Sequence, residues 1–207
     1  MPELATASLT EIRVAGFGGQ GVILAAQILG KAAALHAGLH ATMTQNFGPE
    51  ARGGACSAQL VISPEPVLYP YVTQANILVA MSQEAFTKFL PELRPGGLLL
   101  IERDLVRIET HLPEGTRMYG VPATRIAEKL GKRVVQNIVM LGFFAAVAKV
   151  IPLDAIERAV LDSVPAAMAD LNRQALAAGF DVGTACLASH RPITEHDQIP
   201  EFAAWLE

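Results

Sequence analysis

The sequence predicts an α/β protein with a Rossmann-like, mostly parallel sheet, flanking helices, a helical C-terminal part and an extended tail. Two observations lead to this fold class. Continuous apolar runs of strand length, such as 75–82 and 98–102, alternate with segments whose apolar residues recur at helical spacing. Such continuous runs are typical of parallel strands that helices cover on both faces. A glycine-rich turn, 16–21, also joins the first strand to the first helix, as in doubly wound sheets.

All of the predicted strands lie in the first 122 residues. Strands are expected at 12–15, 39–44, 55–63, 75–82, 98–102 and 117–122, and helices at 22–38, 83–90 and 123–131. Gly38 is a candidate C-cap of the first helix, and Ser82 is a candidate N-cap of the second. Pro-Gly-Gly at 95–97 predicts a turn before the strand 98–102.

The pattern changes to helix from about residue 134 onward. Apolar spacing predicts helices at 134–150, 152–164 and 165–179. Because the periodicity is lost from Phe180, we expect one α/β domain over 1–180 and a C-terminal tail over 181–207. Three apolar residues near the end of the tail suggest that it docks on a partner subunit: Phe202, Trp205 and Leu206.

Composition excludes several function classes. Hydrophobic residues make up 51% of the chain and charged residues only 17%, which is more apolar than a typical domain. The most apolar stretch, 134–150, is broken by Gln136, Asn137 and Lys149, so it predicts a buried helix and not a membrane span. A buried Asn must be hydrogen-bonded, so Asn137 is expected to bond the sheet edge or the glycine-rich turn. The first ten residues lack a signal-peptide pattern, so a cytoplasmic location is expected. With a net charge of −4 and no basic run, nucleic acid is not an expected partner.

The chain shows no metal or catalytic set of its own. Cys56 and Cys186 are too few for an iron–sulfur cluster or a structural zinc site, which takes about four ligands, and each is expected to be a buried apolar residue. His36 and His40 flank the end of the first helix without an evident third ligand. No Ser-His-Asp or Cys-His pattern is recognisable.

The glycine-rich turn carries a strong local signal. Residues 16–21 read Gly-Phe-Gly-Gly-Gln-Gly, a G-x-G-x-x-G pattern between a strand and a helix. Such a turn can bring free N–H groups at the helix N-terminus to an anion such as a phosphate. Alternatively, Gly16, Gly18 and Gly21 serve only the packing of the strand against the helix. The side-chain amide of Gln20 donates and accepts at once, which suits a contact with backbone or a partner.

A complete NAD site is not expected at this turn. Such a site normally has an acidic residue about 20 positions later, at the end of the second strand. The predicted second strand, 39–44, ends without an acid.

A second constrained loop follows that strand. The stretch TQNFGPEARGG, 44–54, places Glu50, Arg52, Gly53 and Gly54 within a few positions. Because ligands of doubly wound sheets sit at the carboxyl ends of the strands, we expect this loop to lie beside the glycine-rich turn. Three interpretations remain open: an internal Glu50–Arg52 pair, a contact of Arg52 with another subunit, or a contact with an anionic ligand.

Three segments together resemble the gamma subunit family of 2-oxoacid:ferredoxin oxidoreductases, over about residues 11–180. They are GFGGQGVILAAQILGKAA, TQNFGPEARGGACSAQLVIS and ILVAMSQEAF. The resemblance implies a gamma-type domain in a complex that decarboxylates a 2-oxoacid oxidatively with coenzyme A, giving acyl-CoA and carbon dioxide. Electrons would pass to ferredoxin or, through a further subunit, to NAD. Thiamine diphosphate, Mg²⁺ and [4Fe–4S] clusters would be held by other subunits, and no cofactor is assigned to this chain alone.

The resemblance also makes both motifs candidates for contact with a cofactor, such as the phosphates of coenzyme A, or with another subunit. These candidates are Gly16, Gly18, Gly19, Gln20, Gly21, Glu50, Arg52, Gly53 and Gly54. The alternative function is a free-standing nucleotide-binding protein or an NAD-dependent dehydrogenase that uses the GFGGQG turn. The sequence does not distinguish among 2-oxoacids.

Overall fold

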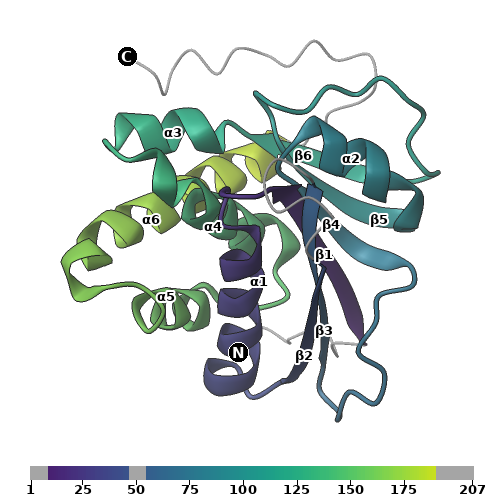
Figure 1. The fold of residues 1–207 in the computed structure, drawn as a ribbon, viewed down its shortest axis with the longest axis horizontal. Helices are drawn as coiled ribbons and strands as arrows, with labels where there is room; N and C mark the ends of the chain where they lie inside the picture. Colours follow the sequence, from purple (N-terminus) through teal and green to yellow (C-terminus); the bar gives the residue numbers. More distant parts are fainter. Residues whose placement is uncertain (1–8, 47–54, 190–207) are drawn as a thin grey trace.

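The computed structural model describes residues 9–46 and 55–189, which form a six-stranded sheet covered by helices (Figure 1). The strand order is β2-β3-β1-β4-β5-β6. The strands are β1 (Thr10–Phe17), β2 (His40–Asn46), β3 (Ala55–Ser63), β4 (Ala75–Ala80), β5 (Leu93–Glu102) and β6 (Arg117–Val121). The α/β fold class and the mostly parallel sheet are confirmed.

One strand runs against the others. β1, β4, β5 and β6 are mutually parallel neighbours, whereas β3 is antiparallel to both β1 and β2. The connection 47–54 is too short for the crossover of about a dozen residues that a parallel neighbour needs. The strand predicted at 55–63 therefore turns back as the second arm of a β2–β3 hairpin.

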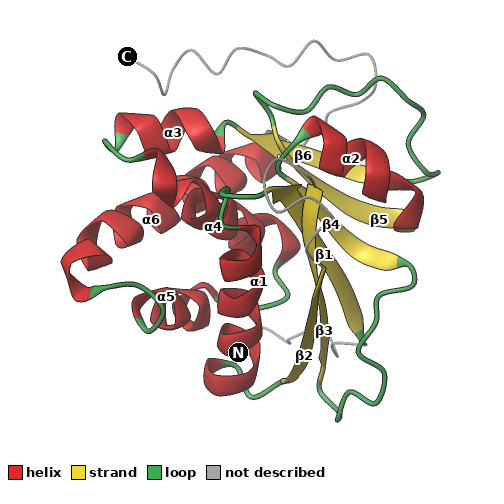
Figure 2. Cartoon of the chain, viewed as in Figure 1, coloured by secondary structure: helices red, strands yellow, loops and turns green. Residues whose placement is uncertain are grey.

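Helices cover the two faces unequally (Figure 2). α2 packs on one face, against β1, β3 and β4, and α1 packs on the other, where α3, α4, α5 and α6 also lie. The helices are α1 (Val22–Lys31), continued by a π-helical segment (Ala32–His36), α2 (Gln83–Phe89), α3 (Ala123–Lys129), α4 (Gln136–Ala148), α5 (Leu153–Leu161) and α6 (Ala169–Ala188). Gly38 ends the first helical segment with φ 67°, as expected for a C-cap glycine.

The helix α4 is buried on nearly all sides, which confirms the prediction for 134–150. It packs closely against α6 through two glycines. A Cβ atom on Gly142 would lie 1.9 Å from the carbonyl oxygen of Leu176, and one on Gly179 would lie 1.9 Å from that of Val139. No side chain fits at either position, so the two backbones touch.

Two local predictions were wrong. The turn expected at 95–97 lies inside β5, where the register against β4 shifts and Gly96 has φ 70°. Gly96 N–H donates to the carbonyl oxygen of Glu114, so the glycines form an irregularity within the strand and do not start it. The helix α6 also continues to Ala188, past the boundary expected after Phe180, because Gly183 lets it stay packed on Phe143.

The remaining tail, 190–207, lies outside the described residues, so the division into a domain and a docking tail stays a prediction. Within the described part of the chain, no helix is both long enough and apolar enough to cross a membrane.

Candidate functional site at the carboxyl edge of the sheet

The glycine-rich turn and both ends of the 47–54 loop share one edge of the sheet. Phe17, at the end of β1, pairs with Ala55, at the start of β3, and Asn46, at the end of β2, pairs with Ser57. The carboxyl ends of β4, β5 and β6 lie at the same edge. The loop thus leaves and re-enters the sheet next to the turn. Its candidate residues lie outside the described residues: Glu50, Arg52, Gly53 and Gly54.

Gln20 fixes the shape of the turn. Its side-chain oxygen Oε1 accepts a hydrogen bond from the backbone N–H of Phe17 at 2.7 Å, and its Nε2 donates to the carbonyl oxygen of Met81 at 2.8 Å. Because Met81 directly follows β4, the buried amide ties the end of β1 to the end of β4. The prediction that Gln20 contacts backbone is confirmed.

Two glycines of the motif are required by packing. A Cβ atom on Gly16 would lie 2.5 Å from Oε1 of Gln20. Gly21 has φ 74°, and its Cβ would lie 2.5 Å from Nδ2 of Asn137, which itself donates to the Gly21 carbonyl oxygen at 3.3 Å. Asn137 therefore meets the glycine turn, as its place in an apolar helix predicted.

The other two glycines face open space. Gly19 has φ 94°, which explains its lack of a side chain, but Gly18 has no positive φ. No atom of the described chain lies within 4 Å of a Cβ built at either position, and both glycines are exposed. Neither strain nor packing within the described residues therefore accounts for Gly18. The packing interpretation fits Gly16 and Gly21 and does not extend to Gly18.

A polar network occupies the same edge at β5. Glu102, which ends β5, is buried and accepts hydrogen bonds from the backbone N–H groups of Thr124 at 2.8 Å and Asp104 at 3.1 Å. Burial raises the pKa of this carboxyl, and the hydrogen bonds from Thr124 and Asp104 oppose the rise. The hydroxyl of Thr124 also lies 3.0 Å from Oε1 of Gln136, at the start of α4. Since Asn137 follows in α4, this helix connects the network to the glycine turn.

The sequence reasoning missed Glu102 and Gln136. The available signal was an acid at the end of an otherwise apolar strand, at the edge where sheets of this kind bind ligands. Ser82 was predicted correctly as an N-cap, since its hydroxyl accepts from the N–H of Ala85 at 3.2 Å.

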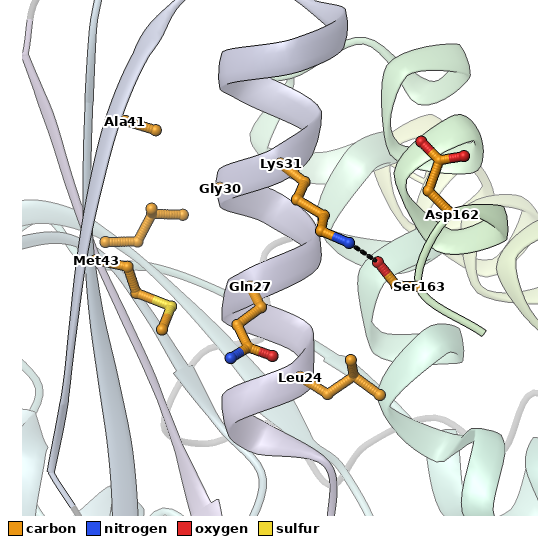
Figure 3. A pocket seen from close by; sticks show the side chains of 9 residues that line it. Leu24, Gln27, Gly30, Lys31, Ala41, Met43, Asp162 and Ser163 are labelled. Carbon is orange, nitrogen blue, oxygen red and sulfur yellow. Dashed lines mark hydrogen bonds between the residues drawn. The ribbon is translucent and has the colours of Figure 1, made fainter.

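Two cavities lie away from the predicted site residues. The first, of about 550 Å³, lies beside α1, where Lys31 donates to the hydroxyl of Ser163 and Met43 of β2 faces the helix (Figure 3). The second, of about 270 Å³, lies between α3 and α6 and is lined by apolar side chains together with four charged ones: Arg103, Arg125, Lys129 and Asp181. Neither cavity is lined by a residue of the glycine turn.

The titratable side chains do not form a metal centre in the described segments, where no group of three or more His, Cys, Asp or Glu could hold an ion. Cys56 and Cys186 are half-buried, not fully buried as expected, and burial is the main cause that raises the pKa of each thiol. A protonated thiol is a poor nucleophile and a poor metal ligand. His36 instead pairs with Asp162 at 3.0 Å.

Comparison with known proteins places the chain in a family. The model of the pyruvate ferredoxin/flavodoxin oxidoreductase family matches residues 11–182. The 2-oxoglutarate synthase subunit KorC of Methanocaldococcus jannaschii is 44% identical over 173 residues, which covers 83% of this chain and 92% of that protein. KorC of Methanothermobacter marburgensis is 47% identical over 177 residues, covering 83% and 95%. The crystal structure of a keto/oxoacid ferredoxin oxidoreductase gamma subunit from Geobacter sulfurreducens is 39% identical, with a TM-score of 0.77 over 86% of this chain and 98% of that one.

The chain therefore belongs to the pyruvate ferredoxin/flavodoxin oxidoreductase family. Within the family it is a gamma subunit of the 2-oxoacid:ferredoxin oxidoreductase type, a component of a multisubunit enzyme. The match covers nearly the whole length of these separate gamma subunits, which favours this assignment over the free-standing dehydrogenase that the GFGGQG turn alone allowed.

Proposed function

We propose that this gamma subunit serves an oxidoreductase that converts 2-oxoglutarate and coenzyme A to the corresponding acyl-CoA and carbon dioxide, with ferredoxin as electron acceptor. The observation that carries the choice of substrate is a difference in identity. Three 2-oxoglutarate synthase subunits are 44 to 47% identical to the chain, whereas two pyruvate synthase subunits are 30% and 28% identical over similar lengths. A fourth 2-oxoglutarate synthase subunit, at 30%, is as distant as the pyruvate ones, so the substrate needs a direct test.

The proposal assigns the reacting cofactors to other subunits. Thiamine diphosphate with Mg²⁺ would supply the decarboxylation chemistry, and [4Fe–4S] clusters would carry the electrons. The described residues of this chain offer neither a cluster of metal-ligating side chains nor enough cysteines for such groups. The chain would contribute to assembly in the cytoplasm, and its tail, 190–207, would dock on a partner subunit.

The carboxyl edge is the part of the chain that we propose to face the active-site side of the complex. Gly18 supports this role because its surroundings within the described chain do not require a glycine. A bare backbone there lets another subunit or the phosphates of coenzyme A approach the start of α1. Arg52 would add a cation beside that backbone, since its loop begins and ends at this edge.

Copurification tests the proposed function. The tagged chain, expressed with its partner subunits, should bring down chains that contain iron, acid-labile sulfide and thiamine diphosphate. The purified complex should reduce ferredoxin with 2-oxoglutarate in a coenzyme A-dependent reaction, and more slowly with pyruvate. A complex that turns over pyruvate with the higher kcat/KM would refute the substrate assignment and leave the family assignment intact.

The role of Arg52 needs a separate experiment. In the assembled complex, Arg52→Ala should raise the KM for coenzyme A or weaken retention of the subunit by about tenfold, the loss expected for one charge-assisted contact. Arg158→Ala is the matched control, because Arg158 is an exposed arginine of α5, where it pairs with Asp154 and lies at neither edge of the sheet. Equal behaviour of the two variants would mean that Arg52 serves only the loop itself.

A further inference from the structure

A second surface stands out at the amino edge, opposite the glycine turn. The segment 64–74, here called the aromatic loop, connects the end of β3 to the start of β4. It exposes three large side chains: Leu68 is 94% exposed, Tyr69 59% and Tyr71 53%. Connecting loops are usually polar, because exposed apolar side chains gain nothing from folding. Three such side chains within four positions therefore call for a physical explanation.

The loop is anchored at both ends. Val72 is buried in a small apolar cluster with Val61 and Ala75, and its backbone N–H donates to Oε1 of Gln59 at 2.7 Å. At the other end, the N–H of Glu65 donates to the hydroxyl of Ser63 at 3.1 Å. Prolines at 64, 66 and 70 restrict the backbone further. The exposure of Leu68 is thus built into the fold.

The two tyrosines stiffen the exposed end. Their rings lie 5.5 Å apart at an interplanar angle of 64°, an edge-to-face arrangement that favours a fixed orientation. Rigid aromatic side chains lose little conformational entropy when a protein binds them, which is why tyrosines are common at the centres of interfaces. The loop is therefore organised before any partner arrives.

We propose that the aromatic loop docks on another subunit of the same oxidoreductase complex, with Leu68 inserted into an aliphatic recess and the tyrosine hydroxyls bonded to polar groups at its rim. The proposal rests on the membership of the chain in a multisubunit enzyme. The loop projects outward, so its binding partner must supply the recess. A two-fold contact between copies would require a complementary recess close to the loop on the same surface. Cavities lie beside α1, between α3 and α6, and, with a volume of about 540 Å³, between α2 and residues 109–113, and no residue of the aromatic loop lines any of these three.

This surface is separate from the carboxyl edge, because the strands run the length of the sheet between them. The subunit would then contact its neighbours at both ends of the sheet. Loss of the loop contact should weaken assembly, but the complexes that still form should keep the wild-type KM for coenzyme A. Failure of the proposed role of the carboxyl edge is therefore distinguishable from failure of this proposal.

The test uses the coexpressed complex and two matched variants. Leu68→Asp places a charge in the proposed recess, and Leu35→Asp makes the same change at a leucine that is 68% exposed in the helical segment after α1. Affinity of the subunit for the rest of the complex is measured by surface plasmon resonance. Leu68→Asp should raise Kd at least about tenfold, and Tyr69→Ala should also raise it. Leu35→Asp should leave Kd unchanged.

Three outcomes would overturn the proposal. An unchanged Kd for Leu68→Asp, or an equal change for Leu35→Asp, would show that the loop has no special role. Light scattering of the isolated chain could also reveal a dimer that Leu68→Asp dissociates, which would make the surface a contact between copies. Unchanged thermal unfolding of the isolated variants would show that the effects on Kd do not come from misfolding.

Discussion

The two edges of the sheet are built on opposite principles. At the carboxyl edge, the side-chain amide of Gln20 is buried, and the backbone of Gly18 and Gly19 is left bare. At the amino edge, the aromatic loop holds Leu68 and two tyrosines out into solvent. The first edge suits close approach of a backbone or an anion, and the second suits insertion into an apolar recess. The comparison shows that the exposure of a residue means little until the contacts that hold it there are known.

The largest expected effect separates two glycines of one motif. Gly21→Ala should lower the free energy of unfolding by at least about 2 kcal/mol, because a side chain there meets Asn137 and must adopt a positive φ. Gly18→Ala, the control in the same turn, should change it by less than about 0.5 kcal/mol. Chemical denaturation of the isolated chain measures both. Equal losses would show that the carboxyl edge has no bare position reserved for contact.

A smaller loss is expected at Gln20. The change Gln20→Ala removes the partners of two buried backbone groups, on Phe17 and Met81, and should cost about 1–3 kcal/mol of stability. Denaturant titration checks it, with the exposed Gln27→Ala in α1 as a control. A variant as stable as the control would contradict the role of Gln20 in holding the turn.

The buried carboxyl of Glu102 predicts a pH dependence. Burial raises its pKa in the folded state above the ordinary value of 4.5, so the folded chain binds the proton more tightly than the unfolded chain. The stability from this group is present below pH 4.5 and is lost as the pH rises through the folded pKa. The unfolding free energy of the wild type should therefore fall relative to that of Glu102→Gln across this window. If the difference in unfolding free energy between the wild type and Glu102→Gln is constant with pH, the carboxylate of Glu102 is not buried as described.

The smallest effect on stability is expected at the amino edge. Because Leu68 is 94% exposed, Leu68→Asp should change the free energy of unfolding by less than about 0.5 kcal/mol, even though it is expected to weaken assembly. Thermal unfolding of the isolated chain checks it. A large loss would mean that Leu68 supports the fold and that the two edges differ less than proposed.

The sequence predicted what depends on local pattern. Continuous apolar runs located the strands. The polarity of Gln20 and Asn137 indicated that their side chains are hydrogen-bonded, and Ser82 was recognised as a helix N-cap. The direction of β3 escaped prediction because apolar periodicity does not record whether a strand turns back. The length of the 47–54 connection did contain that information.

Other features depend on tertiary contacts that no local pattern reveals. Gly142 and Gly179 look like ordinary helix glycines until α4 and α6 are packed together. Glu102 resembles a surface acid until α3 covers it. The exposure of Leu68 depends on two anchors of the loop, the hydrogen bond of Glu65 to Ser63 at its start and that of Val72 to Gln59 near its end. The sequence located the edge of the candidate site, and the structure distinguished which of its glycines are needed for packing.

The most direct test of the central claim is the effect of Gly18→Ala on the assembled enzyme. The account predicts a subunit with unchanged thermal unfolding that nevertheless binds its complex, or supports coenzyme A-dependent turnover of 2-oxoglutarate, at least about tenfold less well, because a methyl group now occupies the reserved space. Wild-type affinity, kcat and KM in this variant would contradict the account, since nothing outside the chain would then need the bare backbone at Gly18.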